Sequence, residues 1–355
     1  MLKKVYDFFC ILIFIITCII IIVFPQTVSY VIKQALLMCA NSIIPSLFPF
    51  MVITQVLSLS NISYKCGKIL SPIMSPVLGI NKNLCGAVFV GLLGGFPNGV
   101  HSVGITYNKG LCTKADAEHA VSVCNNCSFA FVYTIVGINV LGSIKNGLIL
   151  YISMLICCIE TSWILKFVYQ KKSKNDTFYE AKAAQIKSEY SISEIICNSI
   201  SESAKNLINV CGYIIVFYTL SWFMLGGFTR GFLEISSGIL SCTLIAFPKN
   251  IIIIAVLVGF SGVSVIFQVS DACIKYGFSS HKFIASRFIN AVLMPVNATL
   301  IMLLIPREAI SVFNQRITYP GEKPTVTLYA LICLAVLAGI YAIYKTIKNS
   351  NLYKK

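Results

Sequence analysis

Apolar segments recur along the whole of this 355-residue chain, and they constrain its fold more than any other feature. They occupy residues 8–24, 28–59, 129–142, 147–169, 213–225, 232–246, 251–267, 288–305 and 326–344, and a helix needs about 20 predominantly apolar residues to span a bilayer. Charged residues make up only 12% of the chain, against about 25% in soluble domains. The sequence therefore predicts an all-α, polytopic transmembrane helical protein in the lipid bilayer, with about eight crossings.

Positive charge is concentrated at three places in the chain. The formal net charge is +15, and Lys and Arg gather near the N-terminus, in residues 170–191 and near the C-terminus. Because Lys and Arg are enriched in cytoplasmic loops, we expect both termini and the central segment to be cytoplasmic. Nucleic-acid binding is not expected, since no basic stripe with interleaved aromatic residues is present.

The first apolar segment is expected to remain as a helix after synthesis, because Pro25-Gln26-Thr27 follows it instead of the small residues of a signal-peptide cleavage site. The 15 cysteines lie mostly in apolar segments, where thiols behave as small hydrophobes. Cys124, Cys127 and His119 are too few to hold a structural zinc ion, which needs about four ligands. No metal or other cofactor is expected.

Composition divides the chain into five parts. These are an N-terminal transmembrane helix (1–27), a first membrane repeat (28–169), a basic cytoplasmic linker (170–191), a second membrane repeat (192–305), and a loop, last helix and basic tail (306–355). Residues 60–83 contain Pro72 and Pro76 and are expected to form a turn-rich connection. The second repeat opens with Ser191 and Glu194 at the spacing of a capping box, which predicts a helix start.

Glycine interrupts one apolar segment in each repeat. The first interruption is Val90-Gly91-Leu92-Leu93-Gly94-Gly95-Phe96-Pro97-Asn98-Gly99, and the second is Val258-Gly259-Phe260-Ser261-Gly262-Val263-Ser264-Val265. A broken helix is tolerated in a bilayer only against protein or a wet cavity, and a matched pair of them in two halves indicates a transport site. The alternative is that these glycines only permit close helix packing.

The two repeats also share the order of elements that follows the break. Gly110 lies 19 residues after Gly91, and Gly277 lies 18 residues after Gly259. Each is followed by cap residues, a helix, and an amide-bearing turn: Thr113 and Asp116 with Asn125-Asn126 in the first repeat, Ser279-Ser280 with Asn290 and Asn297 in the second. The pattern predicts two structural repeats, inverted or parallel, each with a broken or re-entrant helix.

Several of these stretches resemble a known family. They are Ile44-Pro45-Ser46-Leu47-Phe48-Pro49-Phe50, Gly95-Phe96-Pro97-Asn98-Gly99, Ala117-Glu118, Asn125-Asn126, Gly212-Tyr213 and Leu233-Glu234-Ile235-Ser236-Ser237-Gly238. Together they are similar to the sporulation integral membrane proteins of the YlbJ type, within the nucleoside-recognition or Gate-domain membrane proteins. The resemblance covers roughly residues 35–305, with Phe129 and His101 departing from the family pattern.

The resemblance implies a role in endospore formation and transport of dipicolinic acid, a small anion, across the outer forespore membrane of the bacterial cell. It also leaves a nucleoside or nucleobase cargo open, as the Gate name suggests. A third hypothesis is a membrane scaffold for spore assembly without transport. Homo-oligomerisation is left open as well.

Half-helix ends at the two breaks would carry unpaired N–H groups and partial positive charge, which favour carboxylates. His101 could bind an anion or carry a proton, because an unperturbed imidazole titrates near pH 6.5; the alternative is a hydrogen-bonded packing residue. The candidate substrate-binding residues are Gly94, Gly95, Phe96, Pro97, Asn98, His101, Asn125, Asn126, Ser261, Gly262, Ser264 and Glu234.

Ionisable residues in apolar surroundings are further functional candidates. Glu234, Glu202, Asp271 and Arg287 meet that description. Two have simpler interpretations: Glu234 could pair with Arg230 at the membrane edge, and Asp271 could pair with Lys275 across one helical turn. No Walker A stretch, nucleophile motif or acidic metal cluster is present, so we expect neither ATP-driven transport nor an enzyme.

Overall fold

The computed structural model describes residue 18 and residues 21–60, 62–169 and 191–304. Three predicted parts lie outside the described residues: nearly all of the first helix up to residue 20, the linker 170–190, and everything from residue 305 onward. The described elements belong to one compact unit, and all of them are helical. This confirms the all-α prediction.

The helices follow the predicted order. In the first half they are α2 (Pro25–Met38), η1 (Cys39–Ile43), α3 (Ile44–Leu59), α4 (Ile62–Leu78), η2 (Lys82–Leu84), α5 (Cys85–Gly94), α6 (Asn98–Asn108), α7 (Lys114–Cys124), η3 (Phe131–Val140) and α8 (Ile144–Tyr169). In the second half they are α10 (Ile192–Met224), η4 (Gly227–Phe232), α11 (Ile235–Ser241), η5 (Cys242–Leu244), α12 (Lys249–Phe260), α13 (Gly262–Lys275) and α14 (His281–Leu304).

Five stretches of the described chain are long and apolar enough to cross a membrane. They are Pro25–Leu59, Ile144–Tyr169, Ile192–Met224, Lys249–Lys275 and His281–Leu304. A sixth would be α4 with the η2–α5 stretch, which meet at a bend of 116°. These lengths and compositions confirm a polytopic membrane protein, while the predicted first and last crossings fall on residues that are not described.

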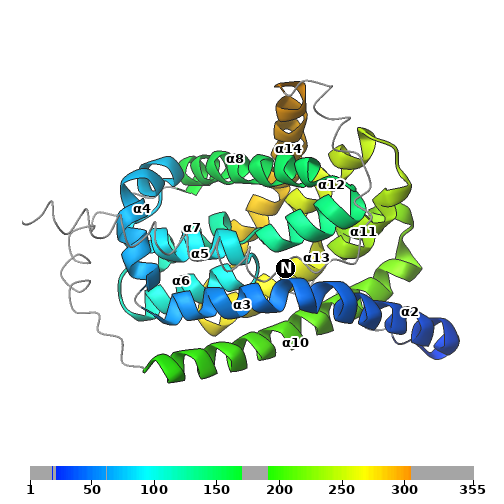
Figure 1. Ribbon diagram of the computed structural model, residues 1–355, viewed down its shortest axis with the longest axis horizontal. Helices are drawn as coiled ribbons and strands as arrows, with labels where there is room; N and C mark the ends of the chain where they lie inside the picture. Colours follow the sequence, from blue (N-terminus) through cyan, green and yellow to red (C-terminus); the bar gives the residue numbers. More distant parts are fainter. Residues whose placement is uncertain (1–17, 19–20, 61, 170–190, 305–355) are drawn as a thin grey trace, which may run out of the picture. The chain divides into compact units, whose positions relative to one another are not determined.

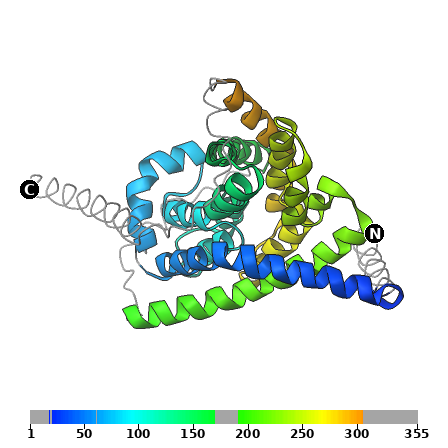
Figure 2. The same ribbon diagram turned by 45° about the vertical axis from the view of Figure 1, so that its right-hand side comes forward.

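Long helices enclose the two breaks. The blue α2–α3 stretch and the green α10 run side by side in both Figure 1 and Figure 2, and α8 and α12 each pack against α14. The shorter helices α5, α6 and α7 pack against one another beside this frame. Segments from the two halves of the chain therefore share one interior.

Many large apolar side chains are exposed on this protein, while several polar and charged side chains are buried beside its apolar core. Large apolar side chains face outward, as Phe167 (91% exposed), Leu303 (76%) and Ile208 (71%) illustrate. The interior holds polar side chains, among them Glu234 and Arg287, of which at most 1% is exposed. Lipid accepts the apolar exterior, and polar groups within a membrane are placed in the protein interior.

The two predicted capping boxes are present. Thr113 Oγ1 accepts from the Asp116 N–H at 3.1 Å, and the Asp116 carboxylate accepts from the Thr113 N–H at 3.3 Å. Ser191 and Glu194 make the same reciprocal pair at the start of α10. Each box satisfies N–H groups that a helix start leaves without partners.

Two sequence predictions of local structure were wrong. Residues 62–78 form helix α4, with Pro72 and Pro76 inside it, instead of a turn-rich connection. Packing of α4 against α5 outweighs the loss of backbone hydrogen bonds at the prolines. In the second half, Asn290 and Asn297 lie within the continuous helix α14, so no amide-bearing turn follows its start.

Candidate functional site

The first break lies between α5 and α6, and α6 folds back to pack on α5. Gly95 has a φ of 70°, a left-handed conformation that glycine adopts without strain. A Cβ at Gly95 would also lie 2.5 Å from the Ser128 nitrogen. Beyond the break, the Phe96 N–H donates to the Asn126 carbonyl at 3.1 Å. The predicted interruption is therefore real, and its backbone is tied to the turn after α7.

The amides near this break bond to the protein's own backbone. Asn98 Nδ2 donates to the Gly94 carbonyl at 3.2 Å, and Asn125 Oδ1 accepts from the Val100 N–H at 3.2 Å. Asn126 Nδ2 donates to the Val123 carbonyl at 2.8 Å. These side chains fix the α5–α6 break against the turn at residues 125–128.

The second break lies between α12 and α13. Ser261 and Gly262 have φ values of 71° and 83°, so two successive residues leave the helical conformation. The Ser264 N–H, in the first turn of α13, donates to the Leu233 carbonyl at 2.9 Å, and Ser264 Oγ accepts from Gln268 Nε2 at 3.2 Å. Unlike α5 and α6, these two helices continue as one 27-residue apolar stretch.

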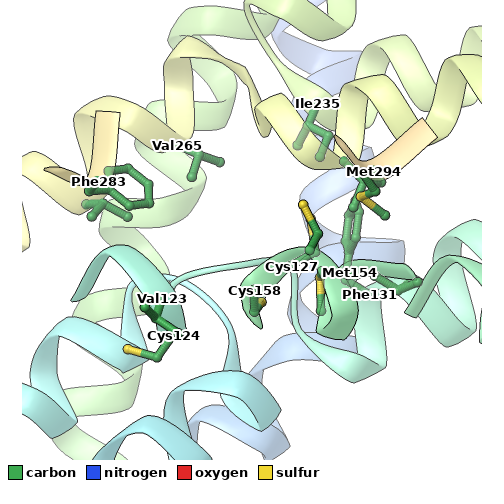
Figure 3. Close-up of a cluster of buried hydrophobic side chains, with 14 of the residues drawn as sticks. Val123, Cys124, Cys127, Phe131, Met154, Cys158, Ile235, Val265, Phe283 and Met294 are labelled. Carbon is green, nitrogen blue, oxygen red and sulfur yellow. The ribbon is translucent and has the colours of Figure 1, made fainter. Parts of the chain in front are cut away.

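A cavity of about 40 Å³ lies between the two halves. The first half lines it with Phe96, Ser128 and apolar neighbours; the second half contributes Glu234, Ser236, Val265 and Gln268. Figure 3 shows Ile235 and Val265 of the second half in one cluster with Cys127 and Phe131 of the first. Since one water occupies at least about 10–15 Å³ of such volume, the cavity has room for only a few water molecules.

A second hollow adjoins this cavity. It is lined by Pro97 and His101 from the first break and by Asp271 and Lys275 of α13, and it shares Val210 and Gln268 with the first cavity. His101 Nδ1 lies 3.3 Å from the Tyr276 hydroxyl. Burial raises the pKa of Tyr276, so the phenol keeps the proton that it can donate to His101.

Four of the twelve predicted site residues line these two hollows, namely Phe96, Pro97, His101 and Glu234. The other eight are not among the lining residues of either hollow. Gly94, Gly95 and Asn98 form the first break, Asn125 and Asn126 hold it from the α7 turn, and Ser261, Gly262 and Ser264 form the second break.

Glu234 is a buried cap, with 1% of its surface exposed. Its carboxylate accepts from the N–H groups of Ser236 at 3.0 Å and Ser237 at 2.7 Å, at the start of α11. The alternative of a pair with Arg230 was wrong, because Arg230 donates to the Leu225 carbonyl and lies over the Trp222 ring. Asp271 and Lys275 do form the exposed pair considered from the sequence, at 3.9 Å.

Arg287 contacts the second break, which the sequence did not predict. Its apolar surroundings made it a candidate, but spacing gave no sign of its partners. It is fully buried on α14, where Nη1 donates to Ser261 Oγ at 3.3 Å. The second break is thus held by a cation from a helix that lies later in the chain.

Comparisons with known proteins agree with these observations. The family model described as Gate, nucleoside recognition, matches residues 40–145, which include the first break. The chain is 21% identical over 309 residues to the sporulation integral membrane protein YlbJ of Bacillus subtilis (strain 168), covering 76% of each chain. No solved structure matches this chain. The predicted resemblance is confirmed: the chain is similar to Gate-containing and YlbJ-type membrane proteins, and it is an integral membrane protein.

Proposed function

We propose that this protein is a sporulation membrane transporter that moves the small anion dipicolinic acid across the outer forespore membrane. The observation that carries the proposal is the meeting of two broken helices at one interior cavity. Phe96 of the first break and Val265 of α13, four residues after Ser261, both line it. Paired breaks of this kind supply sites for ions and anionic substrates in transporters.

Helix starts support an anionic cargo. Helix α6 begins at Asn98 and α13 begins at Gly262, each directly after a break. The N-terminus of a helix carries partial positive charge, equivalent to about half an elementary charge, and favours carboxylates. Dipicolinate has two carboxylates on one ring, and a pair of such ends suits it if these carboxylates displace Asn125 Oδ1 and the Leu233 carbonyl from the Val100 and Ser264 N–H groups.

The cavity volume implies that the structure is a closed state. A space of about 40 Å³ is far smaller than the roughly 300 Å³ or more of typical small-molecule pockets. Transport would therefore require the breaks to move apart, as in alternating access around a fixed site. We expect both termini and the basic linker to be cytoplasmic, and the cargo to cross the membrane through this interface.

Flux measurement tests the proposal directly. Purified protein reconstituted in liposomes should take up labelled dipicolinate above the level of protein-free liposomes. A matched control is the Gly95→Leu variant, which fills the first break and should abolish uptake. Absence of flux from correctly inserted wild-type protein would contradict the proposed cargo.

A cellular assay separates transport from synthesis. A deletion strain should form spores that lack dipicolinate while the mother cell makes it normally. Spores with the usual content would contradict the proposal, and spores deficient in coat or cortex with normal dipicolinate would favour the scaffold hypothesis.

Nucleoside transport is the second candidate, and the Gate match over residues 40–145 favours it. Competition distinguishes the two cargoes. Unlabelled uridine or adenosine should not reduce dipicolinate uptake if the anion is the cargo. Nucleoside flux without dipicolinate flux would transfer the proposal to the second candidate.

A further inference from the structure

Arg287 is buried in full, yet every partner of its guanidinium is neutral. Nε and Nη2 donate to Ser286 Oγ at 3.2 and 3.1 Å, and Nη1 donates to Ser261 Oγ at 3.3 Å. With the Asn290 amide turned so that its oxygen faces the guanidinium, Oδ1 accepts from Nη2 at 2.9 Å. The Phe283 ring lies 4.8 Å away on one face.

The positive charge is therefore solvated but not neutralised. Within the described ranges, the ion pairs are Lys205 with Glu202 and Lys275 with Asp271, and both lie on exposed side chains. The buried carboxylate Glu234 instead caps α11. A buried charge without a counter-charge is strongly destabilising, and intramembrane charges mark ion and substrate pathways by default.

The hydrogen bonds from the guanidinium to the two serine hydroxyls are long, unlike the 2.9 Å bond to Asn290 Oδ1. Charge-assisted N–H···O bonds to carboxylates measure about 2.7–2.9 Å, whereas the contacts to Ser261 and Ser286 measure 3.1–3.3 Å. A guanidinium has five N–H donors in a planar fork that matches a carboxylate. A carboxylate would satisfy this fork better than the two hydroxyls do.

The position of Arg287 links it to the second break. Ser261, which Nη1 reaches, is a non-glycine residue with a φ of 71°. Such a conformation is strained and persists where surrounding structure holds it. The guanidinium is one of the groups that hold it, so occupation of the guanidinium by another acceptor would release the break.

We propose that Arg287 is the carboxylate-binding cation of this protein: a substrate carboxylate displaces the Ser261 hydroxyl from the guanidinium as the α12–α13 break opens. This inference rests on the proposed function, since it assigns the residue that would select an anionic cargo. It also accounts for a buried cation without a counter-charge in an apolar helix.

Binding to purified protein in nanodiscs tests this assignment, with benzoate and dipicolinate as carboxylate probes and uridine as a neutral probe. Arg287→Gln should weaken both carboxylates by about 10-fold to 100-fold, the range expected for a hydrogen bond to a charged group, and leave uridine unchanged. Arg287→Lys should restore part of the affinity. Arg230→Gln, at the other described arginine, serves as the matched control and should bind as the wild type does.

Equal carboxylate affinity in wild type and Arg287→Gln would overturn the inference, as would a wild type that binds neither carboxylate. If Arg287→Gln does not fold, Ser286→Ala is the test variant. Removing this neutral acceptor from the guanidinium should tighten carboxylate binding several-fold. Unchanged or weaker binding of the carboxylates would overturn the inference. If the wild type transports dipicolinate and Arg287→Gln transports it equally well, the role assigned to Arg287 is contradicted, but the proposed function is not. If Arg287→Gln loses benzoate binding and the wild type shows no dipicolinate flux, the proposed cargo is contradicted, but the role assigned to Arg287 is not.

Discussion

The hydroxyl of Tyr276 lies 3.3 Å from Nδ1 of His101 and joins the two halves of the chain beside the second hollow. Tyr276 follows the last turn of α13, and His101 lies in the first turn of α6. The contact therefore connects a helix that starts at one break with the far end of the helix that starts at the other.

Removing the Tyr276 hydroxyl should weaken the contact between α13 and α6. Tyr276→Phe is expected to lower the free energy of unfolding by about 1 kcal/mol, the net value of one hydrogen bond. Unfolding by SDS titration in mixed micelles measures it. Tyr213→Phe is the matched control, because Tyr213 lines the same hollow; a loss as large in the control would show that the effect is not specific to the contact between Tyr276 and His101.

The first break should not tolerate a side chain at Gly95. Gly95→Ala places a Cβ 2.5 Å from the Ser128 nitrogen and forces alanine to a φ of 70°. We expect a loss of at least about 2 kcal/mol in unfolding free energy, since strain and overpacking each cost about 1–3 kcal/mol. Thermal unfolding in detergent gives the comparison.

Gly212→Ala should stabilise the protein, in contrast to Gly95→Ala. Gly212 lies inside α10, and no atom lies within 4 Å of the position that a Cβ would take there. Alanine should therefore stabilise the helix by about 0.5–1 kcal/mol. Destabilisation by both substitutions to a similar degree would argue against a special role for the first break.

Capping of α11 should depend on Glu234. Glu234→Ala removes the acceptor for the Ser236 and Ser237 N–H groups and should cost about 1–2 kcal/mol, the usual value of a lost N-cap. Glu202→Ala, which breaks only an exposed pair with Lys205, should cost less than about 1 kcal/mol. Hydrogen exchange at residues 236–238 should increase in the first variant alone.

Acid should destabilise the protein through His119, on the short helix α7. Burial, followed by the charges of Lys282 and Lys166, lowers the pKa of His119 to about 4. Because the folded protein favours the neutral imidazole, His119 contributes its full stability above about pH 6.5, and that contribution is lost as the pH falls toward 4.

The loss is at most about 3.4 kcal/mol, because the pKa of His119 falls from 6.5 to about 4 and each pKa unit corresponds to about 1.36 kcal/mol. His119→Gln should reduce the pH dependence of the unfolding free energy between pH 7 and pH 4.5. An unchanged slope in that variant would exclude His119 as a source of the acid sensitivity.

Local signals predicted the breaks and the helix starts well. Gly95 and Ser261-Gly262 interrupt their helices where the sequence indicated, and the Thr113–Asp116 box starts α7. These features depend on backbone preferences of a few adjacent residues, which a sequence displays directly. The prolines of α4 were misinterpreted because packing against α5 overrides their local preference.

The arrangement of the candidate site was harder to predict. Arg287 is 26 residues from Ser261 in sequence, and nothing in the spacing indicates that the guanidinium reaches this hydroxyl. The amides of Asn125 and Asn126 looked like substrate donors, yet they bond to the backbone at 100, 121 and 123. Such partners are set by helix packing between distant segments, which a residue pattern does not encode.

The two breaks differ in geometry, since α6 folds back on α5 whereas α12 and α13 continue as one stretch. The halves are consequently not interchangeable parts, despite their similar order of elements. A chimera that exchanges the break sequences would therefore place each of them between helices of the other geometry. Whether the two halves arose by duplication and whether they now move in the same way are therefore separate questions for this protein.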